Sequence, residues 1–150
     1  MEKFNSQIST TIAQSKELIN LGLKPETADL FYSNAGIPAF HTGEYTLYAK
    51  SYKSLMRELN NQITPFDYIP AWSLNRLVDM MPMWIKHKGK DCSFRLNTKS
   101  VGYEYITPNK TAFPTFISIR PEWTNCYYSI IYCIKWLIAE GYFNKNYLDK

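Results

Sequence analysis

The segment 122–140 constrains the fold most, because its pattern predicts a long helix that is apolar on nearly every side. Residues three or four positions apart form two apolar columns: Cys126, Ile130, Cys133 and Leu137, and Tyr127, Ile131, Ile134 and Ile138. Gly141 follows as a typical helix end. A helix of this kind needs other elements to cover it, so the chain must supply a second layer.

Three segments before this helix alternate apolar and polar residues as strands do. They are centred on Cys92, Phe94 and Leu96, on Val101, Tyr103 and Tyr105, and on Thr115, Ile117 and Ile119. A two-residue hairpin loop at 99–100 would pair Leu96 with Tyr103, Phe94 with Tyr105 and Arg95 with Glu104. Lys-Ser is a poor sequence for such a turn, so a longer loop is the alternative.

Helical patterns open the chain. Ile8, Ile12 and Ile19 mark a helix over 7–21, with Asn5 or Ser6 as its cap and Gly22 as its end. Pro25, Glu26 and Asp29 favour a short second helix over 25–32. A third helix follows Ser73, a good N-cap, and stops before Pro82, with Leu74, Leu77, Val78 and Met81 as its buried face.

The region 33–69 has conflicting periods and several glycines and prolines. Residues 44–49 alternate like a strand, whereas Tyr52, Leu55, Met56 and Leu59 have helical spacing. A strand followed by a short helix is one interpretation, and an extended meander is the other.

Together these patterns predict an α+β fold with N-terminal helices, a small three-stranded antiparallel meander and a long C-terminal helix packed on the sheet. The chain has 150 residues, enough to bury a core of its own, and we expect one globular domain over 1–150. No apolar run approaches the roughly 18 residues of a membrane span, and the N-terminus lacks the pattern of a secretory signal. We therefore expect a cytoplasmic protein without membrane contact.

No pattern points to catalysis, a metal or a cofactor. His41 and His87 lack metal-site spacing, and the scattered glycines form no phosphate-binding loop. Cys126 and Cys133 would lie about 10.5 Å apart along one helix, beyond disulfide reach, so with Cys92 they are predicted to be reduced core residues. The sequence thus favours a non-enzymatic protein, although distant residues that converge in the fold leave an unrecognised enzyme as an alternative.

Three segments occur in an order typical of one family: LGLKPETAD at 21–29, IPAWSL at 69–74 and WLIAEGY at 136–142. In these segments the chain resembles small uncharacterised proteins carried by prophages and other mobile elements of gut Bacteroidetes. The resemblance implies an origin on a mobile element, and it implies no activity, ligand or site residue.

Two groups of residues are candidates for binding. The densest basic patch comprises Lys86, His87, Lys88, Lys90, Arg95 and Lys99, with Trp84 and Phe94 as stacking faces. The chain carries a formal net charge of +4, and such a patch can contact phosphates. The alternative is a solvated connection between a helix and the sheet.

The second group is Tyr128, Tyr132 and Trp136, spaced i, i+4 and i+8 on the predicted C-terminal helix. This stripe is either buried under a second layer, such as the helix over 7–21, or exposed as a partner surface. The leading hypothesis is a non-enzymatic accessory or protein-interaction module of a mobile element. Weak nucleic-acid binding through 86–99 is the alternative, and the partner and the oligomeric state stay open.

Overall fold

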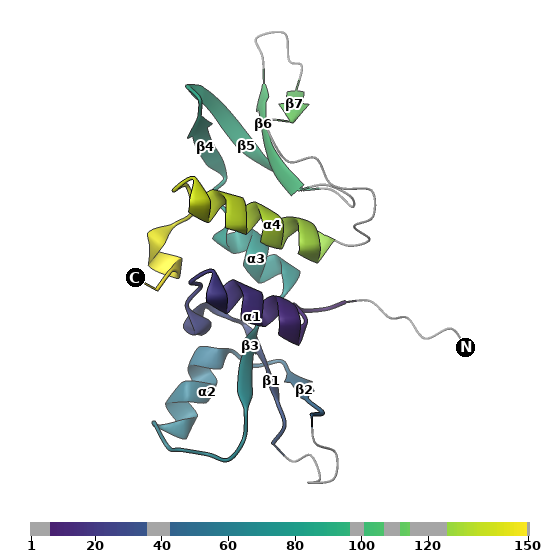
Figure 1. Ribbon diagram of the computed structural model, residues 1–150, viewed down its shortest axis with the longest axis vertical. Helices are drawn as coiled ribbons and strands as arrows, with labels where there is room; N and C mark the ends of the chain where they lie inside the picture. The colour runs from purple at the N-terminus through teal and green to yellow at the C-terminus, as the bar shows by residue number, and fades with distance from the viewer. Residues whose placement is uncertain (1–6, 36–42, 97–100, 107–111, 115–125, 150) are drawn as a thin grey trace, which may run out of the picture. The chain divides into compact units, whose positions relative to one another are not determined.

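The computed structural model describes residues 7–35, 43–96, 101–106, 112–114 and 126–149, which form the mixed α+β fold expected from the sequence (Figure 1). In chain order, the elements are α1 (Ile12–Asn20), η1 (Pro25–Thr27), β1 (Leu30–Ser33), β2 (Thr46–Tyr48), α2 (Tyr52–Leu59), β3 (Tyr68–Ala71), α3 (Leu74–Met80), β4 (Trp84–His87), β5 (Lys90–Leu96), β6 (Val101–Ile106), β7 (Ala112–Pro114), α4 (Cys126–Ala139) and η2 (Lys145–Tyr147).

The chain divides into two compact units. Unit 1 consists of Met1–Leu77 and Asn146–Lys150, and unit 2 consists of Val78–Lys145. Each unit has its own antiparallel sheet, ordered β2-β1-β3 in unit 1 and β4-β5-β6-β7 in unit 2. That 1–150 forms one globular domain stays a prediction.

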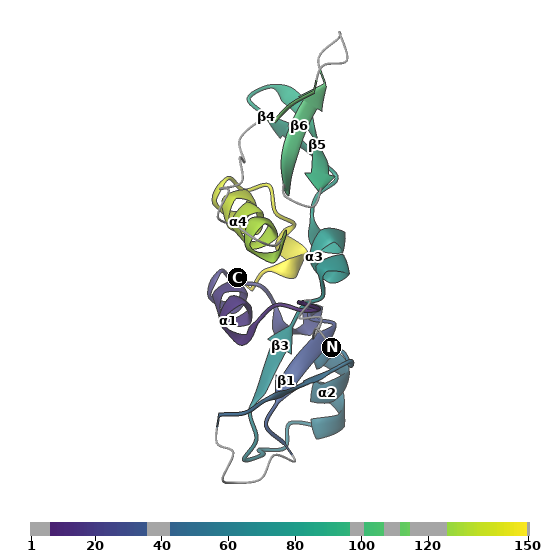
Figure 2. The same cartoon turned by 90° about the vertical axis from the view of Figure 1, so that its right-hand side faces the viewer.

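In unit 1, β1 is the central strand and separates two differently packed faces of the sheet. On one face, the ring of Phe31 stacks on Tyr48 at 5.1 Å between centroids. On the other face, the Tyr32 hydroxyl donates to the backbone oxygen of Thr10 at 2.8 Å. Helix α2 lies alongside β1 and β3, as Figures 1 and 2 show.

Trp72 joins three segments of unit 1. Its side chain is fully buried, and its indole Nε1 donates to Thr27 Oγ1 at 3.0 Å. Its backbone oxygen accepts from the Thr10 amide at 2.8 Å, and its own amide donates to Thr10 Oγ1 at 3.1 Å. Trp72 thus connects the end of β3 to η1 and to the segment that leads into α1.

Ser73 caps α3 as the sequence predicts, since its Oγ accepts from the Arg76 amide at 3.2 Å. The same residue is held by Asp29, whose carboxylate accepts from the Ser73 amide at 2.9 Å and from the Ser73 hydroxyl. Arg76 Nε donates to the backbone oxygen of Thr27 at 2.7 Å. The segment before β1 is therefore bonded to the start of α3.

These bonds explain why the predicted helix over 25–32 is wrong. Only Pro25–Thr27 forms a helical turn, Ala28 is extended with ψ 135°, and β1 begins at Leu30. The Ala28 oxygen accepts from the Tyr52 amide at 3.2 Å, and Phe31 pairs with Pro70 of β3. Partners from distant parts of the chain thus outweigh the local signals of Pro25 and Glu26.

Helix α1 starts later than predicted. Thr11, rather than Asn5 or Ser6, caps it in a reciprocal capping box with Gln14, and Ile8 lies before the helix with 68% of its surface exposed. Its predicted end is confirmed, because Gly22 follows with φ +99°, a conformation that other residues rarely adopt.

The interpretation of 44–59 as a strand followed by a helix is confirmed. The strand is β2, and the helix is α2, whose N-cap is Ser51. Ser51 Oγ accepts from the Ser54 amide at 3.1 Å, and Leu55 is the buried residue of the helix.

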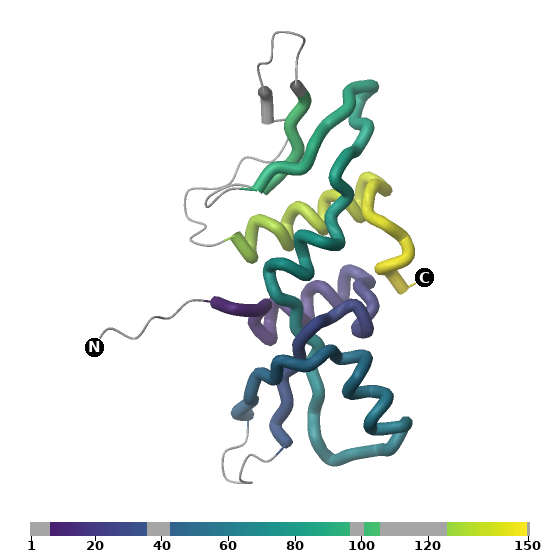
Figure 3. The backbone as a smooth tube through the Cα atoms, turned by 180° about the vertical axis from the view of Figure 1, so that it is seen from behind, coloured from purple at the N-terminus to yellow at the C-terminus, as the bar shows by residue number. Residues whose placement is uncertain are grey.

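In unit 2, β4, β5 and β6 run in succession as an antiparallel meander, which Figure 3 traces through teal and green. Phe94 pairs with Tyr103 instead of Tyr105, and Leu96 pairs with Val101, so the connection is the longer, four-residue alternative. A shift of two residues keeps every side chain on its predicted face, and Arg95 still reaches Glu104 diagonally at 3.3 Å. The predicted strand around Ile117 lies outside the described residues. The strand that pairs with β6 is β7, in which Ala112 lies across from Ile106 and Pro114 across from Glu104.

The contacts of Thr27 predict a specific loss of stability. Thr27→Val removes the acceptor of the buried Trp72 indole at nearly constant volume, so unfolding should become easier by about 1–3 kcal/mol. Urea denaturation measures this change. Thr46→Val is the matched control because Thr46 is exposed, and it should shift stability by no more than about 0.5 kcal/mol. Equal effects of the two substitutions would contradict the role of Thr27.

Candidate partner-binding surface

Helix α4 is covered on most of its circumference, as its apolar columns predict. The buried residues are Tyr127, Ser129, Ile130, Ile131, Cys133, Ile134 and Leu137. The helix packs on β6, and Gly141 ends it with φ +78°. The exposed residues are Tyr128, Tyr132, Lys135 and Ala139, which fall within a sector of about 60° because each residue advances about 100° around the axis. One narrow strip of α4 therefore meets solvent.

Two tyrosines dominate this strip. Tyr128 is 52% exposed and Tyr132 is 50% exposed. The expectation that a second layer buries the stripe is therefore wrong for both residues. They lie one turn apart on a helix whose other sides are held in place, which makes them a preformed aromatic surface.

Trp136 does not continue the strip. Trp136 follows Tyr128 by eight residues, which places its side chain about 80° further around the helix axis. Trp136 therefore lies beside the exposed strip and is partly buried. Its ring meets His87 edge-on at 5.4 Å and Tyr142 at 5.6 Å. The Tyr142 hydroxyl lies 3.0 Å from His87 Nδ1. Trp136 thus belongs to a packed aromatic cluster, which sequence reasoning missed because it grouped His87 with the basic patch.

The alternation of strands β4 and β5 divides the basic patch between two faces of the sheet. Lys86 lies on one face, directly across from Asp91, whereas His87 and Lys90 lie on the other. Lys90 Nζ stands 4.2 Å above the ring of Tyr105. Lys88 is in the intervening turn with φ +49°, Arg95 is paired with Glu104, and Lys99 lies outside the described residues.

The two aromatic residues offered for stacking are divided in the same way. Trp84 lies on the face of Lys86 and Arg95, and it is 66% exposed. Phe94 lies on the opposite face, with its ring 5.6 Å from that of Tyr103. The described members of the patch therefore do not form one basic surface.

Two of the three cysteines are removed from solvent. Cys92 and Cys133 are buried, and burial raises the pKa of the Cys133 thiol to about 12. Across the described ranges, no group of three or more His, Cys, Asp or Glu residues could hold a metal ion. No helix within these ranges is long and apolar enough to cross a membrane.

Comparison of the chain with protein-family models, with curated proteins and with solved structures gives no match.

Burial of Cys133 predicts that its thiol is inert. At pH 8 a thiol with a pKa of about 12 is ionised in about one molecule in ten thousand, and the thiolate is the reactive form. Iodoacetamide should therefore modify the partly exposed Cys126 of the native protein well before Cys133, as peptide mass spectrometry can measure. In urea both should react. Native-state labelling of Cys133 as fast as that of Cys126 would contradict its burial.

The different surroundings of Tyr128 and Trp136 predict different effects on stability. Trp136→Ala removes the ring that contacts His87 and Tyr142, so it should destabilise the protein by about 1–3 kcal/mol. Tyr128→Ala removes a half-exposed ring and should change stability by no more than about 0.5 kcal/mol. Thermal unfolding of both variants tests this, with light scattering over a range of concentrations to detect association. A large loss for Tyr128→Ala in a strictly monomeric protein would contradict the exposed strip.

Proposed function

We propose that the chain is a non-enzymatic, cytoplasmic protein-interaction module of a mobile element, and that it binds a protein partner through the exposed strip of α4. The observation that carries this proposal is the pair Tyr128 and Tyr132, both half-exposed on a helix that is buried on most of its other sides. The mobile-element context rests on the resemblance of the segments 21–29, 69–74 and 136–142.

The physical case for the strip is its composition and its rigidity. Tyrosine is enriched among the residues that contribute most to protein interfaces, because it combines a large apolar ring with a hydroxyl that can bond across the interface. A helix fixed by its buried sides presents the two rings without a large loss of conformational entropy on binding. Lys135 adds a charged group to the same strip, as expected for the polar rim of an interface.

The geometry supports the nucleic-acid alternative less well. A backbone-binding surface gathers positive charge on one side, whereas acidic residues are interleaved with the basic ones here. Lys86 faces Asp91, and Arg95 is already paired with Glu104. Any phosphate contact would compete with these neighbours.

Affinity capture from the native host, with mass spectrometry, tests the proposed function. Wild-type bait should enrich a dominant protein partner, and the double variant Tyr128→Ala/Tyr132→Ala should lose it because both anchor rings are gone. The matched control is Phe66→Ala, which removes an aromatic ring that is 44% exposed in unit 1, and it should retain the partner. Undiminished capture by the double variant would overturn the assignment of the strip, and co-purifying nucleic acid in place of a protein would favour the alternative.

A further inference from the structure

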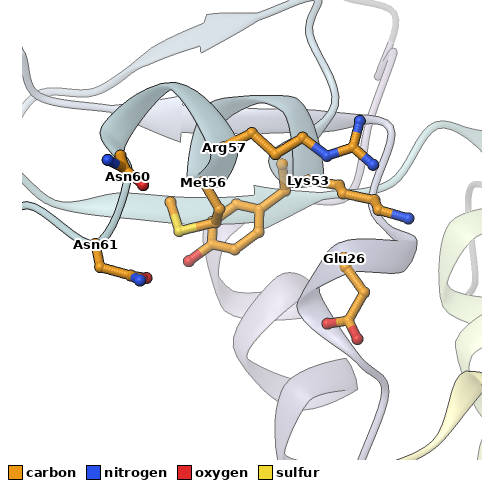
Figure 4. A pocket seen from close by; sticks show the side chains of 7 residues that line it. Glu26, Lys53, Met56, Arg57, Asn60 and Asn61 are labelled. Atoms are coloured by element: carbon orange, nitrogen blue, oxygen red, sulfur yellow. The ribbon is translucent and has the colours of Figure 1, made fainter.

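Unit 1 carries an open cavity of about 470 Å³ between α2 and η1, and the proposed function makes no use of it. Its volume falls within the roughly 300–1,000 Å³ typical of small-molecule sites. Figure 4 shows Lys53 and Arg57 extending from α2 in the same direction, with Glu26 across from them on a separate segment. Asn60 and Asn61 lie at the other end, with Met56 between the two ends.

The three charged side chains at one end of the cavity form no ion pair with one another. Among the described residues, Lys53, Arg57 and Glu26 have neither an ion pair nor a side-chain hydrogen bond. By contrast, Lys50 and Glu58, which flank the same helix segment, pair with each other. Two cations and one carboxylate, all three exposed, therefore line one cavity without pairing with one another.

The middle and the far end of the cavity have a different chemistry. The side chain of Met56 and the half-buried ring of Tyr52 provide apolar contact. Asn60 and Asn61 follow with left-handed backbones at φ 46° and 60°, and Asn60 is the C-cap of α2. Each asparagine side chain offers a carbonyl oxygen and an NH₂ group, so this end can bond an uncharged polar group.

We propose that this cavity binds a free α-amino acid with a polar, uncharged side chain. The ligand carboxylate lies on Arg57 and Lys53, because a guanidinium can bind a carboxylate through two parallel hydrogen bonds. The ligand ammonium pairs with Glu26. The side chain passes over Met56 to the amides of Asn60 and Asn61.

The presence of both charge signs at one end selects the zwitterion over a simple anion. An inorganic anion on Arg57 would be repelled by Glu26, whereas an amino-acid head group satisfies both charges at once. The site is open, so solvent screens these pairs and the affinity should be modest. This inference is independent of the partner surface on α4.

A titration of the isotope-labelled full chain with glutamine, followed by amide NMR shifts, tests the proposal. Saturable shifts are expected for amides in 24–28 and 52–61. N-acetylglutamine lacks the ammonium and glutaminamide lacks the carboxylate, and each should bind roughly tenfold more weakly, as expected for loss of a charge-assisted bond. Norleucine, which lacks the side-chain amide, should also bind more weakly. Inorganic phosphate is the anion-only probe.

Matched variants identify the residues. Arg57→Gln should weaken glutamine binding roughly tenfold, whereas Lys50→Gln removes the same charge near the same helix and should not. Glu26→Gln should abolish the difference between glutamine and N-acetylglutamine, and Glu58→Gln should preserve it. The amide spectrum of each variant shows whether it is folded. The comparison of ligands on the wild-type chain does not depend on any variant.

Three results would overturn the proposal. One is the absence of saturable shifts up to about 10 mM glutamine, a concentration that reveals even weak sites. Another is binding of phosphate as tight as that of glutamine. The third is an equal loss of affinity in Arg57→Gln and Lys50→Gln, which would mean that only the overall charge matters.

Discussion

The architecture of unit 1 depends on the burial of Trp72. A buried indole contributes a large apolar area, but its N–H must find an acceptor inside the protein. Thr27 supplies that acceptor, and Thr10 bonds both backbone groups of Trp72. Because these partners come from segments far apart in the chain, the start of α1, η1 and the end of β3 have to meet at one point. The bonds of Asp29 to Ser73 extend the same junction to α3.

Unit 2 follows from a similar requirement. Helix α4 is apolar on most sides and needs cover, and the sheet offers a face that includes Ile85, Cys92 and Tyr103, all buried. The strand alternation that builds this face sends Lys86 and Arg95 to the opposite side. Core formation thus separates the basic residues that are adjacent in the sequence, and it leaves Tyr128 and Tyr132 half-exposed on α4. The same constraint therefore divides the basic patch between two faces and sets the two tyrosines on one side of α4.

Local signals predicted the elements that are decided locally. The cap at Ser73, the left-handed Gly22 and Gly141, and the helical spacing of α2 all act within a few residues of the chain. The segment 25–32 could not be predicted this way, because the partners that hold it extended come from Tyr52 and β3. The separation of Trp136 from the exposed strip could have been predicted, because eight residues of helix place its side chain about 80° away from that of Tyr128. The cavity on α2 could not be predicted from the sequence. Its charged end combines Glu26 with two residues of α2, and no sequence pattern indicates that these two segments lie close together.

The two candidate sites depend on different physical forces, and this difference separates them experimentally. Binding at Tyr128 and Tyr132 buries apolar ring surface, so added salt should weaken it little. Binding beside Arg57 and Glu26 relies on exposed charges, whose attraction falls as the Debye length shortens from about 10 Å at 0.1 M salt to about 3 Å at 1 M. The sites also lie in different units, and no residue of one lines the other. Salt should therefore weaken binding beside Arg57 and Glu26 more than binding at the strip, where Lys135 adds only a charge at the rim.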